Sequence, residues 1–254
     1  MKNILFFCKK ELLEYWRTKK LLVLWIAFAA FGIMSPLFAK LMPQILKASF
    51  GEALPIELPT PTSIDAWAQF YKNISQIGIY LLIIMFSGIV NREISKGTLT
   101  NLVTKGLNRT VVIISKYFLM LILWSLVIVT SFGITLGYTQ YYFPDQLSPH
   151  FFAGFLLLWL FGLFISSVVV LSSTVFRSIY SSLFGAIGLM ILLYVLNLWE
   201  KVVKWNPISL MSVNMAVVQG QEVWSDYVPA LAMGGLVAVV FLLMAVGVLK
   251  RKKL

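Results

Sequence analysis

The long apolar runs of this chain carry no Asp, Glu, Lys or Arg in their central stretches, although these runs cover more than half of the 254 residues. A soluble protein of this size could not hide so much apolar surface from water, so the chain is expected to lie in a lipid bilayer. Charged residues make up 12% of the sequence, about half of the roughly 25% usual in soluble domains. Buried carboxylates that couple a carrier to an ion gradient are therefore missing from the expected spans.

Six of these runs are long enough to cross a hydrocarbon core of about 30 Å. The sequence predicts an all-α polytopic membrane protein that forms one transmembrane domain over residues 1–254. The expected spans are about 21–39, 74–90, 111–138, 151–176, 179–199 and 228–249. The fourth and fifth spans come from one apolar stretch, which we divide at a tight turn around Arg177. Serine pairs near this turn are expected to allow close helix packing rather than to bind a substrate: Ser166-Ser167, Ser172-Ser173 and Ser181-Ser182.

The basic residues predict the orientation of the spans. Sixteen of the 21 Lys and Arg residues fall in the N-terminal segment, the second-to-third connection, the turn at Arg177 and the C-terminal tail, and only three of the ten acidic residues accompany them. Because Lys and Arg accumulate on the cytoplasmic side of membrane proteins, both termini are expected there. The net charge of +11 then indicates topology and contact with anionic lipid, and not nucleic-acid binding.

Two connections are expected on the outer side. Residues 40–73 contain Pro43, Pro55, Pro59 and Pro61, which predicts an irregular or extended loop in the middle of that connection. Residues 199–227 mix apolar residues with Trp and Tyr. This segment is expected either to lie in the outer interface or to re-enter it as a short hairpin.

The first 20 residues predict an amphipathic helix that lies flat on the inner leaflet. Its apolar face contains Ile4, Leu5, Cys8, Leu12, Tyr15 and Trp16. Its polar face contains Lys10, Glu11, Glu14, Arg17 and Thr18. Such a helix is either a plain membrane anchor or also a contact with a partner protein, in which case Lys10, Glu14 and Arg17 are the candidate contact residues.

The second-to-third connection, residues 91–110, is too long and too apolar for a bare connector. Gly97 permits a turn and Thr98 is a candidate N-cap, after which Leu99, Leu102 and Val103 form one apolar helix face. Gly106 is expected to end this helix in the left-handed conformation. A short surface helix with an apolar edge suits a groove on a cytosolic protein.

This connection resembles that of ABC type-2 exporter membrane subunits, the six-span permeases of bacterial ATP-driven efflux systems. The matching positions are Glu93, Gly97-Thr98, Leu99 with Leu102-Val103, Gly106-Leu107-Asn108-Arg109 and Lys116. Gly106 and Asn108 stand where the family usually has Pro and Ser. The layout of the whole chain is similar to the family, but the motif covers only about 25 residues.

The resemblance implies a subunit of the bacterial cytoplasmic membrane that pairs with a second permease copy, identical or related, and rests on two separate ATP-binding subunits. The implied coupling residues on this chain are Arg92, Glu93, Lys96, Gly97, Thr98, Leu99, Asn101, Leu102, Val103 and Arg109. The chain has no G-x-x-x-x-G-K-[ST] phosphate loop. We therefore expect no cofactor on this chain, ATP and Mg on the partner subunit, and no enzymatic activity of the chain alone. His150 is the only histidine and is expected to be structural, not a metal ligand.

The uncharged spans suit an amphipathic or hydrophobic cargo. Within the family, exporters of amphipathic peptides (phenol-soluble modulins) are the first expectation, and drug or bacitracin-like antibiotic efflux or immunity the second. Polar span residues are candidates for lining the path or, equally, for helix–helix hydrogen bonds: Ser87, Ser125, Thr130, Thr135, Tyr194 and Asn197. An ATPase-independent channel and a non-transporting scaffold remain alternative classes.

Overall fold

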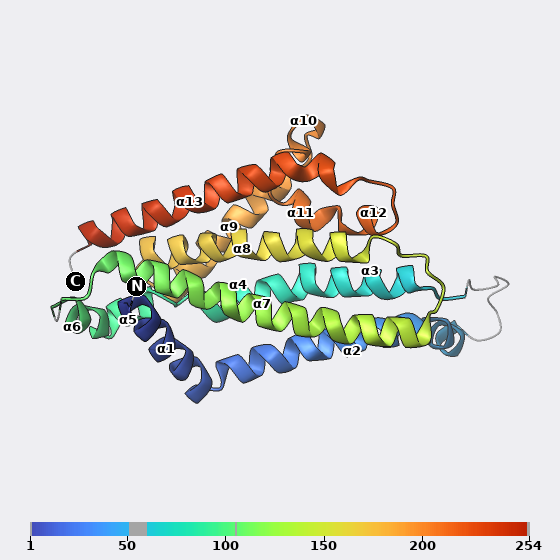
Figure 1. Ribbon diagram of the computed structural model, residues 1–254, viewed down its shortest axis with the longest axis horizontal. Coiled ribbons are helices and arrows are strands. Elements are labelled where there is room, and N and C mark those ends of the chain that lie inside the picture. The colour runs from blue at the N-terminus through green and yellow to red at the C-terminus, as the bar shows by residue number, and fades with distance from the viewer. Residues whose placement is uncertain (1, 51–59, 105, 253–254) are drawn as a thin grey trace.

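The computed structural model describes residues 2–50, 60–104 and 106–252. These residues form helices and no strand, and the long helices lie side by side along the long axis of the molecule (Figure 1). Six helical segments are long and apolar enough to cross a membrane, which confirms the predicted all-α polytopic architecture. They are α2 (Lys20–Phe50), the segment Ser63–Ser95, α7 (Arg109–Tyr142), α8 (Phe151–Val175), α9 (Ile179–Leu196) and the segment Trp224–Arg251 that includes α13 (Val228–Arg251).

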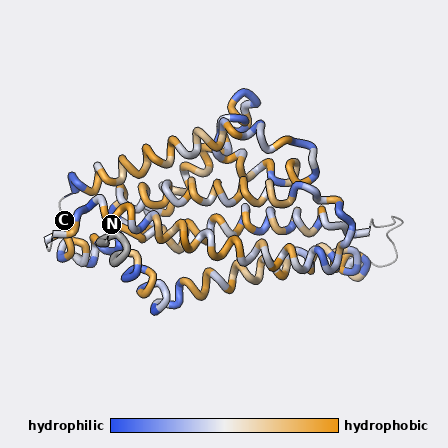
Figure 2. The backbone as a smooth tube through the Cα atoms, in the orientation of Figure 1, coloured by the Kyte–Doolittle hydropathy of each residue, from blue (hydrophilic) through white to orange (hydrophobic). Residues whose placement is uncertain are grey.

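Both ends of the described chain lie at the same end of the bundle, as an even number of crossings requires (Figure 1). We call this the basic end, because α1 (Lys2–Arg17), the short helices after the second span, and Lys250 and Arg251 gather there. The other end is called the far end. Hydrophilic residues concentrate at both ends and hydrophobic residues between them (Figure 2). This distribution is that of a multi-pass membrane protein.

The first two spans are longer than predicted. Helix α2 continues through Pro36 and Pro43 to Phe50, so residues 40–50 are helical and the predicted end of the first span at residue 39 is wrong. Pro55 and Pro59 lie outside the described residues. The second span begins with α3 (Ser63–Asn73) and continues through the π-helical turn η2 (Ile74–Gly78) into α4 (Ile79–Phe86).

Helix α3 starts where it does because Thr62 and Asp65 cap it. The backbone N–H of Thr62 donates to the Asp65 carboxylate at 2.8 Å, which satisfies a donor that the helix itself leaves free. The other four long helices agree with the predicted spans to within four residues at either end. The predicted turn at Arg177 is also confirmed, since α8 ends at Val175 and α9 begins at Ile179.

Small residues bring the helices into close contact, as expected for a membrane bundle. A Cβ added to Gly162 of α8 would lie 2.0 Å from the Trp124 ring of α7. The Ser173 hydroxyl accepts hydrogen bonds from the backbone N–H groups of Val90 (2.9 Å) and Asn91 (3.3 Å), just after α4 ends. The packing role predicted for the serine pairs is therefore observed at Ser173.

Residues 199–227 fold back onto the bundle. They form α10 (Glu200–Val203), α11 (Ser209–Ser212), α12 (Asn214–Val218) and the 3-10 helix η3 (Trp224–Tyr227). Residues 206–211 are all buried, and α12 touches α8 where a Cβ on Gly154 would lie 2.9 Å from Val218. Trp199, Trp205 and Trp224 stay exposed. The middle of this segment is therefore covered by protein, as a re-entrant segment requires, and both the re-entrant and the interfacial alternatives stay predictions.

Candidate functional site

The candidate site lies at the basic end, where α1 contacts the beginning of α7 and the connection after the second span (Figure 1). This connection contains two short helices, α5 (Asn91–Ser95) and α6 (Thr98–Thr104). Gly97 separates them with a φ of +68°, and Gly106 follows α6 with a φ of +90°. Both predicted glycine turns are therefore confirmed.

The end of α6 is closed by its own backbone. The N–H of Gly106 donates to the Val103 carbonyl at 2.9 Å, and the N–H of Leu107 donates to the Leu102 carbonyl at 3.1 Å. This pair of bonds is the Schellman arrangement, which requires the left-handed residue. Asn108 then caps α7, because its side chain accepts from the N–H of Thr110 at 2.9 Å. Asn108 is therefore the N-cap of α7.

Four charged side chains from three helices form what we call the four-charge network: Lys10 and Glu11 of α1, Glu93 of α5 and Lys116 of α7. The Nζ atom of Lys116 lies 3.1 Å from Glu11 Oε2 and 3.0 Å from Glu93 Oε2. The Nζ atom of Lys10 lies 3.2 Å from Glu11 Oε1 and 3.0 Å from Glu93 Oε1. Two positive and two negative groups therefore alternate, so the network is neutral overall.

The inner half of this network is removed from solvent. The side chains of Lys116 and Glu11 are 1% and 3% exposed, whereas that of Lys10 is 45% exposed. Burial raises the pKa of the Glu11 carboxyl, although Lys116 and Lys10 oppose this shift. Paired charges at this depth are tolerated only while each keeps its partners. The network consequently fixes α1 and α5 to the first turns of α7.

The position of Glu11 corrects the predicted faces of α1. The buried face consists of Glu11 and Tyr15, and the Tyr15 ring stacks on Phe86 of α4 with centroids 5.3 Å apart. Leu12 and Trp16 are exposed, Trp16 to 65%. The side chains of Ile4 and Leu5 lie outside the described part of the structure. Glu11 faces inward because its partner Lys116 is there, and the exposed apolar residues are left for lipid.

The apolar stripe of α6 also differs from the expectation. Leu99 is fully buried, and Leu102 and Val103 are half-buried against the same core. The prediction that this apolar edge fits a groove on a cytosolic protein is therefore wrong for Leu99, because Leu99 holds α6 onto the chain's own bundle. Lys96 and Asn101 are exposed, so the surface that this connection offers to another protein is polar.

A cleft of about 350 Å³ lies between α1 and this connection. Its lining residues are Lys10, Glu14, Arg92, Glu93, Lys96, Thr98, Asn101 and Leu102. We call it the polar cleft. The structure thus brings two of the three candidate contacts of α1 together with six of the coupling residues. Arg17, Gly97, Leu99, Val103 and Arg109 are not part of its lining.

Arg109 has a different place, which the sequence did not indicate. Its Nη1 donates to the carbonyl oxygens of Leu249 (2.7 Å), Lys250 (2.9 Å) and Lys252 (3.0 Å). These carbonyls belong to the last turn of α13 and the residue just after it, and a cation there is also favoured by the helix dipole. Arg109 therefore ties the sixth span to the start of the third.

Three carboxylates of the site, those of Glu11, Glu14 and Glu93, have oxygens within 4.8 Å of one another. Such a group could hold a divalent cation if it stood alone. Here Lys10 Nζ lies within 3.9 Å of all three, and Lys116 contacts two of them. The ammonium groups supply the positive charge, so the arrangement is accounted for without a metal.

The candidate path residues are mostly engaged in hydrogen bonds between helices. Ser125 accepts from Trp159 Nε1 at 2.9 Å, Thr135 donates to the Gly32 carbonyl at 3.2 Å, and Asn197 accepts from Ser209 at 3.0 Å. Three further observations complete the set: Thr130 accepts from Trp25 Nε1, Ser87 donates to Ile84 within its own helix, and Tyr194 is 39% exposed. The helix–helix alternative is therefore favoured for Ser125, Thr130, Thr135 and Asn197.

Sequence comparison adds a coarse result. No protein-family model matches the chain. The chain is similar to YxlG, an uncharacterized transmembrane protein of Bacillus subtilis (strain 168), with 24% identity over 213 residues that cover 83% of each chain. Together with the six apolar helices, this similarity supports a multi-pass membrane protein.

Proposed function

We propose that the chain is the membrane-spanning subunit of an ATP-driven ABC exporter and uses a separate ATP-binding subunit. In this proposal the basic end faces the cytoplasm of a bacterial cell, and two permease copies and two ATP-binding subunits form the complex. The observation that carries the proposal is the four-charge network. It joins the two segments that border the polar cleft to α7, so a force applied at the cleft acts directly on a span.

The contact with the ATP-binding subunit is proposed to be polar. Arg92, Lys96 and Asn101 border the polar cleft, and Lys96 and Asn101 are exposed. An acidic or hydroxyl-bearing element of the partner would match these side chains, since a guanidinium and an ammonium donate hydrogen bonds and accept none. Leu99 contributes indirectly, because it holds α6 against the bundle.

Co-purification tests this contact. The chain is expressed with a candidate ABC ATP-binding protein from the same organism, and the complex is isolated through a tag on the chain. We expect Lys96→Glu combined with Asn101→Glu to reduce the recovered ATP-binding protein at least tenfold. A matched control is Lys201→Glu, an exposed charge reversal in α10, which lies away from the basic end (Figure 1) and should leave recovery unchanged. Equal recovery with the double variant would refute the polar cleft as the docking surface.

The proposed cargo is amphipathic or hydrophobic, and amphipathic peptides of the phenol-soluble-modulin kind are the first candidates. The supporting feature is the absence of charge from the central parts of the spans, because an uncharged wall favours apolar and weakly polar surfaces. ATP-dependent accumulation of such a peptide in inverted vesicles should require both subunits. Accumulation of a small apolar antibiotic, without accumulation of the peptide, would instead indicate drug or antibiotic efflux. Ion flux through the chain alone would instead favour a channel.

A further inference from the structure

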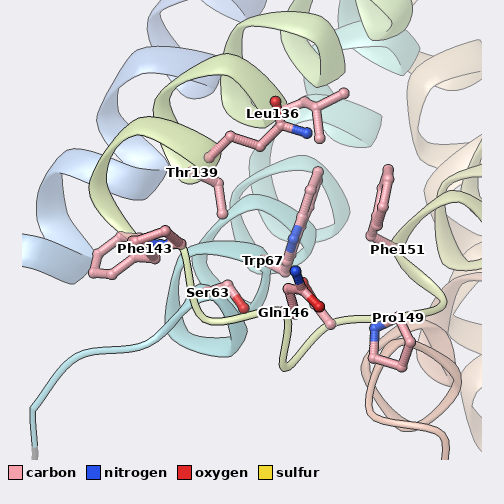
Figure 3. A pocket seen from close by; sticks show the side chains of 11 residues that line it. Ser63, Trp67, Leu136, Thr139, Phe143, Gln146, Pro149 and Phe151 are labelled. Carbon is pink, nitrogen blue, oxygen red and sulfur yellow. The ribbon is translucent and has the colours of Figure 1, made fainter.

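A second cavity, of about 510 Å³, lies at the far end, between the beginning of α3, the end of α7 and the link to α8 (Figure 3). We call it the far-end cavity. It is lined by Ser63, Trp67, Leu136, Thr139, Gln140, Phe143, Pro144, Gln146, Ser148, Pro149 and Phe151. Its volume suits a small organic molecule. No residue of the four-charge network or of the polar cleft takes part in it.

The walls of the cavity combine rings with uncharged polar groups. Trp67 and Phe151 stack with their ring centroids 5.5 Å apart (Figure 3). Gln140 and Gln146 supply exposed amides. None of the eleven lining side chains is charged. The neighbouring Asp145 carboxylate is already engaged, because it accepts from the backbone N–H groups of Ser63 (2.7 Å) and Leu147 (3.1 Å).

Two buried hydroxyls that line this cavity, those of Ser63 and Thr139, make no hydrogen bond to any described residue. Each of the two residues is 3% exposed. A buried hydroxyl without a partner is unfavourable, and such groups are normally satisfied by protein, water or a ligand. Since Thr139 lines the cavity, an atom bound there is in position to satisfy it.

The position of the cavity along the long axis of the bundle restricts which class of ligand can bind there. Helix α7 has 34 residues and is therefore about 51 Å long, whereas the hydrocarbon core is about 30 Å thick. Thr139 lies in the last turn of this helix. Exposed Tyr138 and Tyr141 lie beside it, and tyrosine favours the headgroup level. The cavity consequently lies near the boundary between lipid and water.

We propose that the far-end cavity binds an uncharged, hydroxyl-bearing ring such as the sugar headgroup of an amphipathic molecule. Threonine and serine hydroxyls and glutamine amides both donate and accept hydrogen bonds, as do the hydroxyls of a sugar. A charged group would lose its hydration without finding an opposite charge on these walls. The proposal for this site does not rest on the proposed export function.

Equilibrium binding of radiolabelled octyl glucoside, kept below its micelle-forming concentration, tests the site. The full chain is embedded in lipid nanodiscs, and empty nanodiscs give the background from partition into lipid. We expect saturable binding that Thr139→Val weakens about fivefold, which corresponds to one hydrogen bond. Gln140→Trp, which fills the cavity from an exposed position, should abolish it. The matched control is Ser131→Ala, since Ser131 is a buried hydroxyl without a partner that does not line the cavity.

Three outcomes would overturn the proposal: no saturable binding, unchanged binding in Gln140→Trp, or equally tight binding of octyl sulfate, which has the same tail and a charged head. Thermal unfolding of each variant in the nanodisc checks folding, and Gln140→Trp keeps the test decisive if Thr139→Val is unstable. Competition by methyl glucoside distinguishes the two sources of the same chemistry. Effective competition assigns the site to free sugars, and its absence assigns the site to glycolipid headgroups.

Discussion

Replacing Lys116 by Met removes the ammonium group that lies 3.1 Å from Glu11 and 3.0 Å from Glu93. Met has a similar length and fits the same apolar surroundings, so the main change is electrostatic. The two carboxylates then share only Lys10, and the network carries one uncompensated negative charge.

The expected cost follows from the geometry. Two unit charges 3.1 Å apart attract each other by about 5 kcal/mol at an effective dielectric constant of about 20, and the desolvation of Lys116 offsets part of the two attractions that are lost. Removal of one member of a buried ion pair typically costs about 3–5 kcal/mol. We expect Lys116→Met to lower the free energy of unfolding by this amount.

Lys10→Met is the matched control, because it deletes the other lysine of the same network. The side chain of Lys10 is 45% exposed, so water screens its contacts and the expected loss is about 0–1 kcal/mol. A double variant, Glu11→Gln with Lys116→Met, removes one charge of each sign. It should be more stable than Lys116→Met alone, since the remaining Lys10 and Glu93 still form a pair.

Reversible unfolding by detergent titration in mixed micelles, followed by circular dichroism, measures these differences. Equal losses in Lys116→Met and Lys10→Met would show that burial does not decide the strength of the network. Strict additivity of the Glu11 and Lys116 substitutions would show that the two side chains do not interact. Either result would refute the reasoning.

Three other predictions concern packing, helix ends and pH. Gly162→Ala should lower the free energy of unfolding by about 1–3 kcal/mol, because the added Cβ would overlap Trp124. Gly188→Ala, with open space around the added Cβ, should change this free energy by less than about 1 kcal/mol. Thermal unfolding in detergent compares the two variants. Arg109→Gln should speed hydrogen exchange in the last turn of α13, because the Arg109 side chain donates to carbonyl oxygens in that turn. Exchange in the first turn of α13 should not change. Unchanged exchange at both ends of α13 would contradict the capping role of Arg109. Burial raises the pKa of Asp145, but hydrogen bonds from neighbouring groups outweigh this and hold the pKa below its usual value. The stability that the Asp145 carboxylate contributes is therefore present above the usual pKa and is lost as the pH falls through the folded-state pKa. Melting temperatures from pH 6 to 3 should fall more in the wild type than in Asp145→Asn, and parallel curves would exclude the effect.

The spans were predictable because long uncharged apolar runs have few alternatives to crossing a bilayer. The extent of α2 was not, because the span was expected to end at residue 39 and Pro43 was assigned to the connection that follows. Each proline removes one N–H donor, but a helix that stops within the membrane leaves many more backbone groups unpaired. The helix therefore continues through both residues. A proline is thus weaker evidence for a loop here than in a soluble chain.

The candidate site was predictable as a segment but not as a geometry. The periodicity around Leu99 indicated an apolar face, yet the same pattern results whether that face meets a partner protein or the chain's own core. Glu11 and Lys116 are 105 positions apart, and nothing in either local sequence shows that they meet. A polar residue on an amphipathic helix was assigned to water, whereas the structure gives it an opposite charge from a distant helix.

Helix α7 reaches both ends of the molecule without a proline in its 34 residues. Lys116 lies near its beginning and Thr139 in its last turn, about 35 Å apart along a helix with a rise of 1.5 Å per residue. An unbroken helix of this kind tilts as a single rigid rod, since sharp kinks need a proline, a π-bulge or an inserted group. A displacement of its first turns is therefore transmitted across the whole membrane to the wall of the far-end cavity.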